Sequence, residues 1–210
     1  MDIRQIKLSR MATFCYLVGD PASHSCALID PAFDTDRLLN IAAEAGYTIT
    51  NVINTHRHPD HCAGNAAIMA ATGARLLIHH LETKALGGFV NRSFCRALGG
   101  KPSPPADILL RHDEIVTIGD IRLTVLHTPG HTPGGICLHG HGQLFTGDTL
   151  FVGAVGRTDL PGGSSSTLLT SIQKEIYALP DETVIWPGHD YGPATVSTVG
   201  REKQTNPFTG

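Results

Sequence analysis

The sequence lacks the features of a disulfide-stabilised or membrane-spanning protein. Its 210 residues include five cysteines, an odd number, and no two of them stand at C-x-x-C spacing. This argues against a disulfide framework and for a reducing compartment. No apolar run approaches the roughly 18 residues of a membrane span, and the first stretch, MDIRQIKLSR, has no apolar core of signal-peptide length. We therefore expect a cytoplasmic protein that does not enter a membrane.

Charge of one sign is also scarce. The net charge is -3 with neutral histidines, and charged residues make up only 17% of the chain. No basic block stands out, which argues against a nucleic-acid partner. Hydrophobic residues reach 41%, so the chain can form a core rather than remain disordered. A chain of this length suits one sizeable domain better than two. We predict a single domain over residues 1–210.

Short β-favouring runs alternate with helical patterns along this chain. Residues 3–30 read as strands, and further strands are expected at 50–56, 75–80, 108–119, 121–130, 134–140, 143–148 and 183–190. Helices are expected at 34–46, 65–74 and 164–180, with a short one in the tail 193–208. Each half reads strands, then helix, then strand. This order predicts an α/β fold of two packed sheets with helices outside, in four layers.

Residues 80–107 do not fit this alternation. They are rich in glycine and proline and show no clean period. We interpret them as a surface loop, and such loops often shape a binding site.

The stretch NTHRHPDHCAG, residues 54–64, carries His56, His58, Asp60 and His61 within six positions. His56 and His58 are two apart, so in an extended segment they point to the same side. Asp60 and His61 follow Pro59, where we expect the chain to turn into a helix. Polar groups buried at this density need an ion to satisfy them. Imidazole with carboxylate suits zinc, iron or manganese rather than calcium.

Three more candidate ligands follow later strands: His131 in TPGHTPGG, Asp148 in LFTGDTL and His189 in IWPGHDYG. The total is five histidines and two aspartates. One metal needs about four protein ligands, or three with a position open for chemistry. Seven ligands therefore suit two metals about 3.5–4 Å apart that share one bridging group.

Other histidines and one cysteine invite the same interpretation less strongly. We interpret His79 and His80 as structural, and His127 as a packing residue or a partner of a ligand. Cys62 follows His61, but on a turn leading into a helix we expect its side chain to enter the core rather than bind metal.

These motifs together resemble those of the metallo-β-lactamase superfamily. The resemblance implies an αββα sandwich with metals in a cleft at one edge of the two sheets. It assigns one metal to His56, His58 and His131, a second to Asp60, His61 and His189, and a bridging position to Asp148. Aspartate at position 148 disfavours those β-lactamases that carry cysteine there.

Within this superfamily the chain looks most similar to glyoxalase II and to the persulfide dioxygenases. The stretch GDTLFVGAVGRTDL, residues 147–160, resembles a glyoxalase II segment whose basic residue contacts glutathione, and that residue matches Arg157. Two positions later glyoxalase II has an aromatic residue, whereas this chain has Asp159. Glyoxalase II also carries a C-terminal helical domain for which this chain is too short. GRTD and HDYG look instead like the persulfide dioxygenases and like short bacterial proteins of the glyoxalase II type. Those dioxygenases hold one iron through residues matching His56, His131 and Asp148.

The resemblance thus implies two alternative enzymes. In the first, two divalent ions, most readily zinc but also iron or manganese, activate a water that attacks the thioester of a glutathione conjugate or a similar small thiol. Asp60 would bind metal and relay a proton, while Arg157 would contact the substrate. In the second, a single Fe(II) oxidises glutathione persulfide with oxygen, and Asp60 and His61 orient the ligands. Tyr191, two residues after His189, is a candidate in the second enzyme for contact with the substrate or with a metal ligand. A non-catalytic metal protein is disfavoured because no ligand is missing. A homo-oligomeric assembly stays open.

Overall fold

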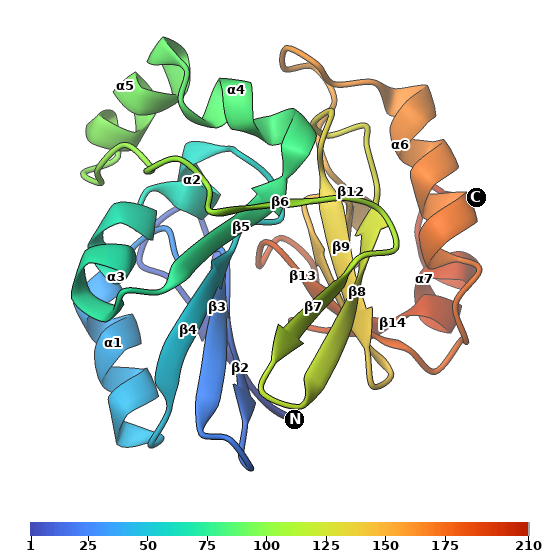
Figure 1. The fold of residues 1–210 in the computed structure, drawn as a ribbon. Coiled ribbons are helices and arrows are strands. Elements are labelled where there is room, and N and C mark those ends of the chain that lie inside the picture. Colours follow the sequence, from blue (N-terminus) through green and yellow to red (C-terminus); the bar gives the residue numbers. More distant parts are fainter. Residues whose placement is uncertain (210) are drawn as a thin grey trace.

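The computed structural model describes residues 1–209. Two six-stranded sheets pack face to face, with helices on their outer faces (Figure 1). In sheet order, the first contains β1 (Asp2–Lys7), β2 (Phe14–Asp20), β3 (Ser25–Ile29), β4 (Thr48–Ile53), β5 (Arg75–His79) and β6 (Ile108–Leu110). The second contains β14 (Ser197–Thr198), β13 (Val184–Pro187), β10 (Gln143–Gly147), β9 (Ile136–Gly140), β8 (Ile121–His127) and β7 (Ile115–Ile118). A separate ribbon pairs β11 (Leu150–Phe151) with β12 (Ala154–Val155). The predicted αββα architecture is confirmed.

Helices cover each sheet. On the first sheet these are α1 (Thr35–Glu44), α2 (Pro59–Cys62), α3 (Asn65–Thr72), η1 (His80–Glu82), α4 (Thr83–Leu86) and α5 (Phe89–Ala97). On the second sheet α6 (Ser165–Ser171) continues as a π-helical stretch, η2 (Ile172–Ile176), beside α7 (Val199–Thr205) (Figure 1). Within residues 1–209, no helix has both the length and the apolar character needed to cross a bilayer.

Strand direction decides where the functional residues come together. β3, β4, β5 and β6 run parallel, so the segments that follow β3 and β4 leave the sheet at the same edge. In the second sheet β10 and β13 are also parallel, so Asp148 and His189 leave together. Hydrogen bonds join the two sheets at this end, from Phe14 N to Gly188 O at 2.8 Å and from Ile136 N to Thr55 O at 3.0 Å.

The core lies in three layers that match this arrangement. Between the sheets, Tyr16, Ile53, Leu123 and Phe145 belong to one buried cluster. A second cluster fills the space under the helices of the first sheet, and a third lies under α6, η2 and α7. Strand β2, which lies between β1 and β3, is buried at every position, as expected for a strand covered on both faces.

Two expectations from the sequence were wrong in detail. Residues 80–97 form η1, α4 and α5 rather than an irregular loop. The period was hidden because α4 has only four residues and because Phe89, Val90 and Phe94 of α5 are 85%, 68% and 59% exposed. The single strand expected at 108–119 is two, β6 and β7, which belong to different sheets. The chain turns between them at Asp113, whose φ of 64° lies in the left-handed region.

Candidate metal centre

The structure brings all seven predicted ligands together where the two sheets meet. Ligand atoms within 4.8 Å of one another define three overlapping groups: His56, His58 and His131; His56, His61 and Asp148; and Asp60, His61 and His189. These side chains come from four segments, which follow β4, β8, β10 and β13.

Local chain geometry explains the spacing of the first motif. His58 is extended, with φ -59° and ψ 145°, and Pro59 occupies the first turn of α2. Proline suits that position because its missing N–H would have no helical partner there. The expected turn into a helix after Pro59 is thus confirmed, and Asp60 and His61 project from α2 while His56 and His58 precede it. Cys62 is fully buried, as expected for a core residue.

The imidazole nitrogens of this centre face one another. Nε2 of His131 lies 2.9 Å from Nδ1 of His58 and 3.3 Å from Nε2 of His56. Nε2 of His61 lies 3.1 Å from Nε2 of His189. A neutral imidazole has one proton and one lone pair, so nitrogens that converge in this way suit a shared cation. Asp148 Oδ1 is buried and accepts no hydrogen bond, although it lies 3.2 Å from His61 Nε2. These donors fit a metal centre.

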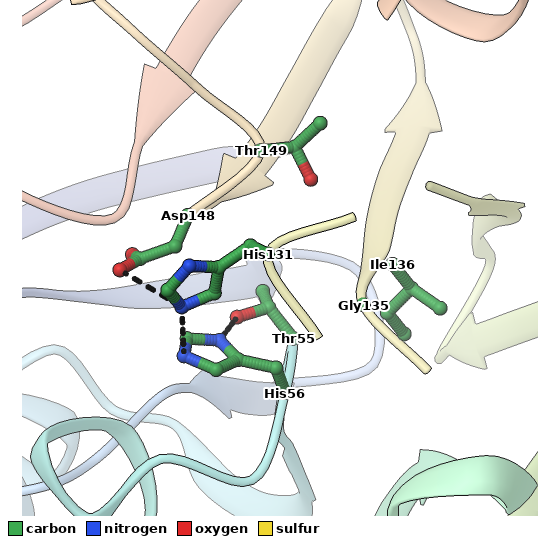
Figure 2. Close-up of a pocket in the computed structure, with 7 residues that line it drawn as sticks. All are labelled: Thr55, His56, His131, Gly135, Ile136, Asp148 and Thr149. Atoms are coloured by element: carbon green, nitrogen blue, oxygen red, sulfur yellow. Dashed lines mark hydrogen bonds and ion pairs between the residues drawn. The ribbon is translucent and has the colours of Figure 1, made fainter. Parts of the chain in front are cut away.

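Asp148 lies between His131, of the group with His56 and His58, and His189, of the group with Asp60 and His61. Its Oδ2 is 3.5 Å from Nε2 of His131 and 3.4 Å from Nε2 of His189. Figure 2 shows the side chains of His56, His131 and Asp148 converging beside Thr55. Burial raises the pKa of Asp148, but His189 and His61 outweigh that effect and hold the pKa well below its usual value. The carboxylate is therefore ionised and lies between His131 and His189.

His56 and His58 are neutral near pH 7. Burial, together with the neighbouring His131, lowers the pKa of His58 to about 3. Burial and the surrounding histidines also hold the pKa of His56 well below its usual value. Neutral imidazole is the form that ligates metals.

The remote ring nitrogens of three of these histidines are each held by an oxygen atom. His131 Nδ1 lies 2.7 Å from the carbonyl of Arg157, and His189 Nδ1 lies 2.9 Å from the carbonyl of Met11. A carbonyl only accepts, so each Nδ1 carries the proton and Nε2 is left free for a metal. His61 Nδ1 lies 2.9 Å from Asp30 Oδ2, which favours the same tautomer.

Asp30 was missed by the sequence analysis. It is buried, follows β3, and accepts from both the N–H and the hydroxyl of Thr55, at 2.8 and 2.7 Å. It therefore links the segment that follows β3 to the start of the first ligand motif. The available signal was an aspartate directly after an apolar strand.

Glu82 was missed too, and it fastens two ligand-bearing segments together. Its fully buried carboxylate accepts from the backbone N–H of Arg57 at 3.0 Å and from the N–H of Gly134 at 2.6 Å. It also pairs with the Arg57 guanidinium at 3.0 Å. Arg57 stands between His56 and His58, and Gly134 belongs to the loop that carries His131.

We expect Glu82→Gln to lower the free energy of unfolding by about 2–4 kcal/mol, because it leaves the mostly buried Arg57 cation without its partner. The affinity for the metal should fall about 10–100-fold, as for other partners of metal-bound segments. Urea unfolding of metal-stripped protein and chelator competition measure the two effects. Glu114→Gln is the matched control, because Glu114 is an exposed glutamate that accepts only from the N–H of Arg111. Equal stability and equal metal affinity of the two variants would contradict the role of Glu82 in holding the two ligand-bearing segments together.

The two predicted substrate residues lie beside the ligands but face solvent. The Arg157 guanidinium makes two 2.7 Å hydrogen bonds to Asp159. The Tyr191 ring stacks on His189 with centroids 4.5 Å apart, and its hydroxyl donates to Met11 O at 3.3 Å. Burial, Asp148 and Asp60 raise the pKa of Tyr191 to about 12, so the phenol keeps its proton at neutral pH.

His79 and His127 lie outside the ligand groups found within residues 1–209. Their rings stack with centroids 4.2 Å apart. His79 Nδ1 accepts from the N–H of Leu81 at 3.4 Å, and His127 Nε2 lies 2.9 Å from Pro133 O. These contacts agree with the structural and packing roles expected for the two residues.

The stack predicts a pH-dependent stability. Burial, His127 and His80 lower the pKa of His79 from 6.5 to about 4. Between these values the unfolded chain binds a proton that the folded chain does not, so stability is retained above the unfolded pKa and lost as pH falls toward 4. We expect His79→Asn to reduce this loss by about 2–3 kcal/mol. Urea unfolding at a series of pH values measures the slope, and His141→Asn, at an exposed residue with φ 53°, should leave it unchanged.

Known proteins share sequence similarity with this chain over the region that contains the seven candidate ligands. Residues 8–189 match the family model described as the metallo-beta-lactamase superfamily. A hydroxyacylglutathione hydrolase from Polaromonas sp. is 37% identical over 182 residues, which cover 85% of this chain and 62% of that protein. Human mitochondrial persulfide dioxygenase ETHE1 is 32% identical over 209 residues, covering 98% of this chain and 74% of that protein.

Two solved structures are similar to this chain over nearly its whole length. ETHE1 from Myxococcus xanthus superposes with a TM-score of 0.85 at 36% identity, covering 99% of this chain and 84% of that chain. TTHA1623, solved in a di-iron-bound form, superposes with a TM-score of 0.84 at 32% identity, covering 98% and 99% of the two chains. The fold, the converging ligands and these matches lead to one conclusion: the chain belongs to the metallo-beta-lactamase superfamily.

Proposed function

We propose that this chain is a metal-dependent thioester hydrolase, similar to glyoxalase II, that acts on glutathione conjugates or similar small thiols. One observation carries the proposal. Asp148 Oδ2 is almost equally distant from His131 and His189, at 3.5 and 3.4 Å, and these two histidines belong to different ligand groups. A carboxylate between two ligand sets suits a binuclear centre. The similarity to the Polaromonas hydroxyacylglutathione hydrolase supports the same activity.

The proposed ligands form two groups of three residues with one aspartate between them. His56, His58 and His131 would hold one divalent ion, Asp60, His61 and His189 would hold the other, and Asp148 would serve both. Nitrogen and oxygen donors accept zinc, iron or manganese. When bound, two such ions would lower the pKa of a water toward about 7 and polarise a thioester carbonyl.

Asp60 is the proposed proton acceptor. Its Oδ2 lies 3.5 Å from His189 Nε2, and its side chain is 14% exposed, so water and substrate can reach it. The buried Asp148 is 10% exposed and is surrounded by histidines. The two aspartates bring two negative charges, fewer than the four positive charges of two divalent ions. The loaded centre would therefore attract an anionic conjugate.

Arg157 and Tyr191 are the proposed substrate contacts. The Arg157 side chain is 62% exposed, and its pairing with Asp159 takes place in solvent. A surface ion pair of this kind exchanges readily, so the guanidinium can turn to a substrate carboxylate, which it would bind in the same bidentate way. The Tyr191 ring stacks on His189, and its protonated hydroxyl would turn from Met11 O to the substrate as a donor.

A second candidate is a persulfide dioxygenase. It is favoured by the match of 98% of this chain to human ETHE1 and by the Myxococcus xanthus structure. Under this alternative His56, His131 and Asp148, which converge in Figure 2, would form the two-histidine, one-carboxylate triad of a non-haem iron site. Asp60 and His61 would then orient ligands and water.

Metal content and two assays on one sample separate the candidates. Protein purified without added metal should contain close to two ions per chain and should consume S-D-lactoylglutathione. Near one iron per chain with oxygen uptake on glutathione persulfide would overturn the proposal in favour of the dioxygenase.

Asp60→Asn sharpens this comparison. The hydrolase requires that the variant lose the second ion and thioester turnover together. A single-iron enzyme would keep its full metal content, because Asp60 is not a ligand there.

A further inference from the structure

Two cysteine sulfurs face each other beside the metal centre. Cys62 Sγ lies 3.9 Å from Cys95 Sγ, and both residues are fully buried free thiols. Cys62 is the last residue of α2 and directly follows His61, whereas Cys95 lies on α5. The reaction proposed above uses neither thiol.

These sulfurs lie in the contact between α5 and α2. α5 lies beside α2 (Figure 1), and its buried residues are Asn91 and Cys95. The Asn91 amide donates to Cys62 Sγ at 3.6 Å, so both buried residues of α5 meet the same sulfur. Cys62 Sγ also donates to the carbonyl of Arg57 at 3.2 Å. Any change of bonding at Cys62 therefore acts on α5 and on the segment of metal ligands together.

A cavity of about 330 Å³ lies beside the contact between α2 and α5. Ala63 and Gly64, which follow Cys62, line it on one side, and Leu98 to Gly100, which follow α5, line it on another. The cavity thus lies next to the C-terminal ends of both helices and leaves space there for a small shift.

We propose that Cys62 and Cys95 form a reversible disulfide that weakens the ligand group of Asp60, His61 and His189. The oxidant is a hydroperoxide. One thiol takes up an oxygen atom from it, which gives a sulfenic acid and leaves an alcohol or water. The other sulfur then attacks the sulfenic sulfur, the S–S bond forms and a water leaves. The two thiols lose two electrons, which reduce the hydroperoxide. Two equivalents of a small thiol reverse the change and become its disulfide.

The effect on the metal centre follows from distance. An S–S bond is about 2.05 Å long, so the sulfurs must approach by nearly 2 Å from their 3.9 Å separation. α2 has only four residues, two of which are Asp60 and His61, so a shift of its end also moves these ligands. Metal–ligand distances tolerate only about 0.2 Å. The group of His56, His58 and His131 contains no residue of α2, and Arg57, between two of its members, is also held by Glu82. This group should therefore keep its ion.

The test uses the full chain loaded with zinc and treated with one to five equivalents of hydrogen peroxide. Alkylation in denaturant followed by peptide mass spectrometry locates the disulfide, and a chromophoric chelator reports released zinc. We expect a linked peptide pair containing Cys62 and Cys95, release of one of two zinc equivalents, and recovery of both thiols with dithiothreitol.

Variants make each step falsifiable. Cys95→Ala and Cys95→Ser should lose the linked peptide and retain both zinc ions under peroxide. Cys137→Ala removes another buried cysteine and should behave as the unmodified chain does. Oxidation of the thiols without a Cys62–Cys95 link would overturn the disulfide, and a link without loss of zinc would overturn the switch. Only the second step rests on the proposed binuclear centre, and neither readout involves a substrate, so failure here is distinguishable from failure of the hydrolase assay.

Discussion

Replacing Asp148 by asparagine should reduce the metal content from two ions per chain to one and lower thioester turnover by at least about 1000-fold. Partners that only orient a ligand typically account for about 10–100-fold, whereas Asp148 would itself be a ligand of both ions. Asparagine keeps the size of the side chain but removes the charge that serves both ligand groups. Metal analysis of the purified variant and a thioester assay under saturating zinc measure the two effects.

Asp113→Asn is the control for this change. Its side chain is 77% exposed and pairs only with the exposed His112, and asparagine tolerates its left-handed backbone. We expect two ions per chain and full turnover. If Asp148→Asn retained both ions, Asp148 would not be a bridge, and the main support for a binuclear hydrolase would be lost.

The ligand set was readable from the sequence because its signals are local. His56, His58, Asp60 and His61 lie within one short motif, and each of the three remaining ligands follows an apolar run. The strand periods predicted two sheets, and the ends of strands are where such sites gather. No long-range information was needed to select these residues, although it was needed to show that they meet.

Asp30 and Glu82 could not be found in that way because their roles depend on contacts distant in sequence. Asp30 reaches Thr55 only because β3 and β4 are parallel neighbours, and no local pattern states that pairing. Glu82 lies in a stretch interpreted as a loop, and its partners Arg57 and Gly134 are 25 and 52 positions away. A buried carboxylate among apolar residues is visible only after the fold is known.

The interpretation of residues 80–107 as a loop failed over residues 80–97 for a different reason. Helix prediction relies on apolar residues that mark a buried face, but in α5 the buried residues are Asn91 and Cys95, while two phenylalanines are exposed. The helix is thus inverted relative to the usual pattern. The buried side chains of Asn91 and Cys95 contact Cys62. The polar and thiol character of this buried face hid the helix from prediction, and it is also the basis of the proposed disulfide.

We expect Asp30→Asn to lower the free energy of unfolding by about 2–4 kcal/mol. The carboxylate accepts from the Thr55 N–H, the Thr55 hydroxyl and His61 Nδ1. An amide turns one acceptor into a donor, so at least one of these groups must remain buried without a partner. The substitution should not strain the backbone, because asparagine tolerates the left-handed φ of 55° at this position.

The same variant tests whether Asp30 also contributes to metal binding by orienting His61. Without the carboxylate, His61 loses the partner that favours its Nδ1–H tautomer, so affinity at the second ligand group should fall about 10–100-fold. Asp34→Asn is the matched control: Asp34 also has a left-handed φ, 54°, and accepts from Ser9, but it holds no ligand. Urea unfolding of stripped protein and zinc competition should separate the two variants. If Asp30→Asn lowered stability yet left zinc affinity intact, Asp30 would support the fold alone and the orientation of His61 would depend on the helix that carries it.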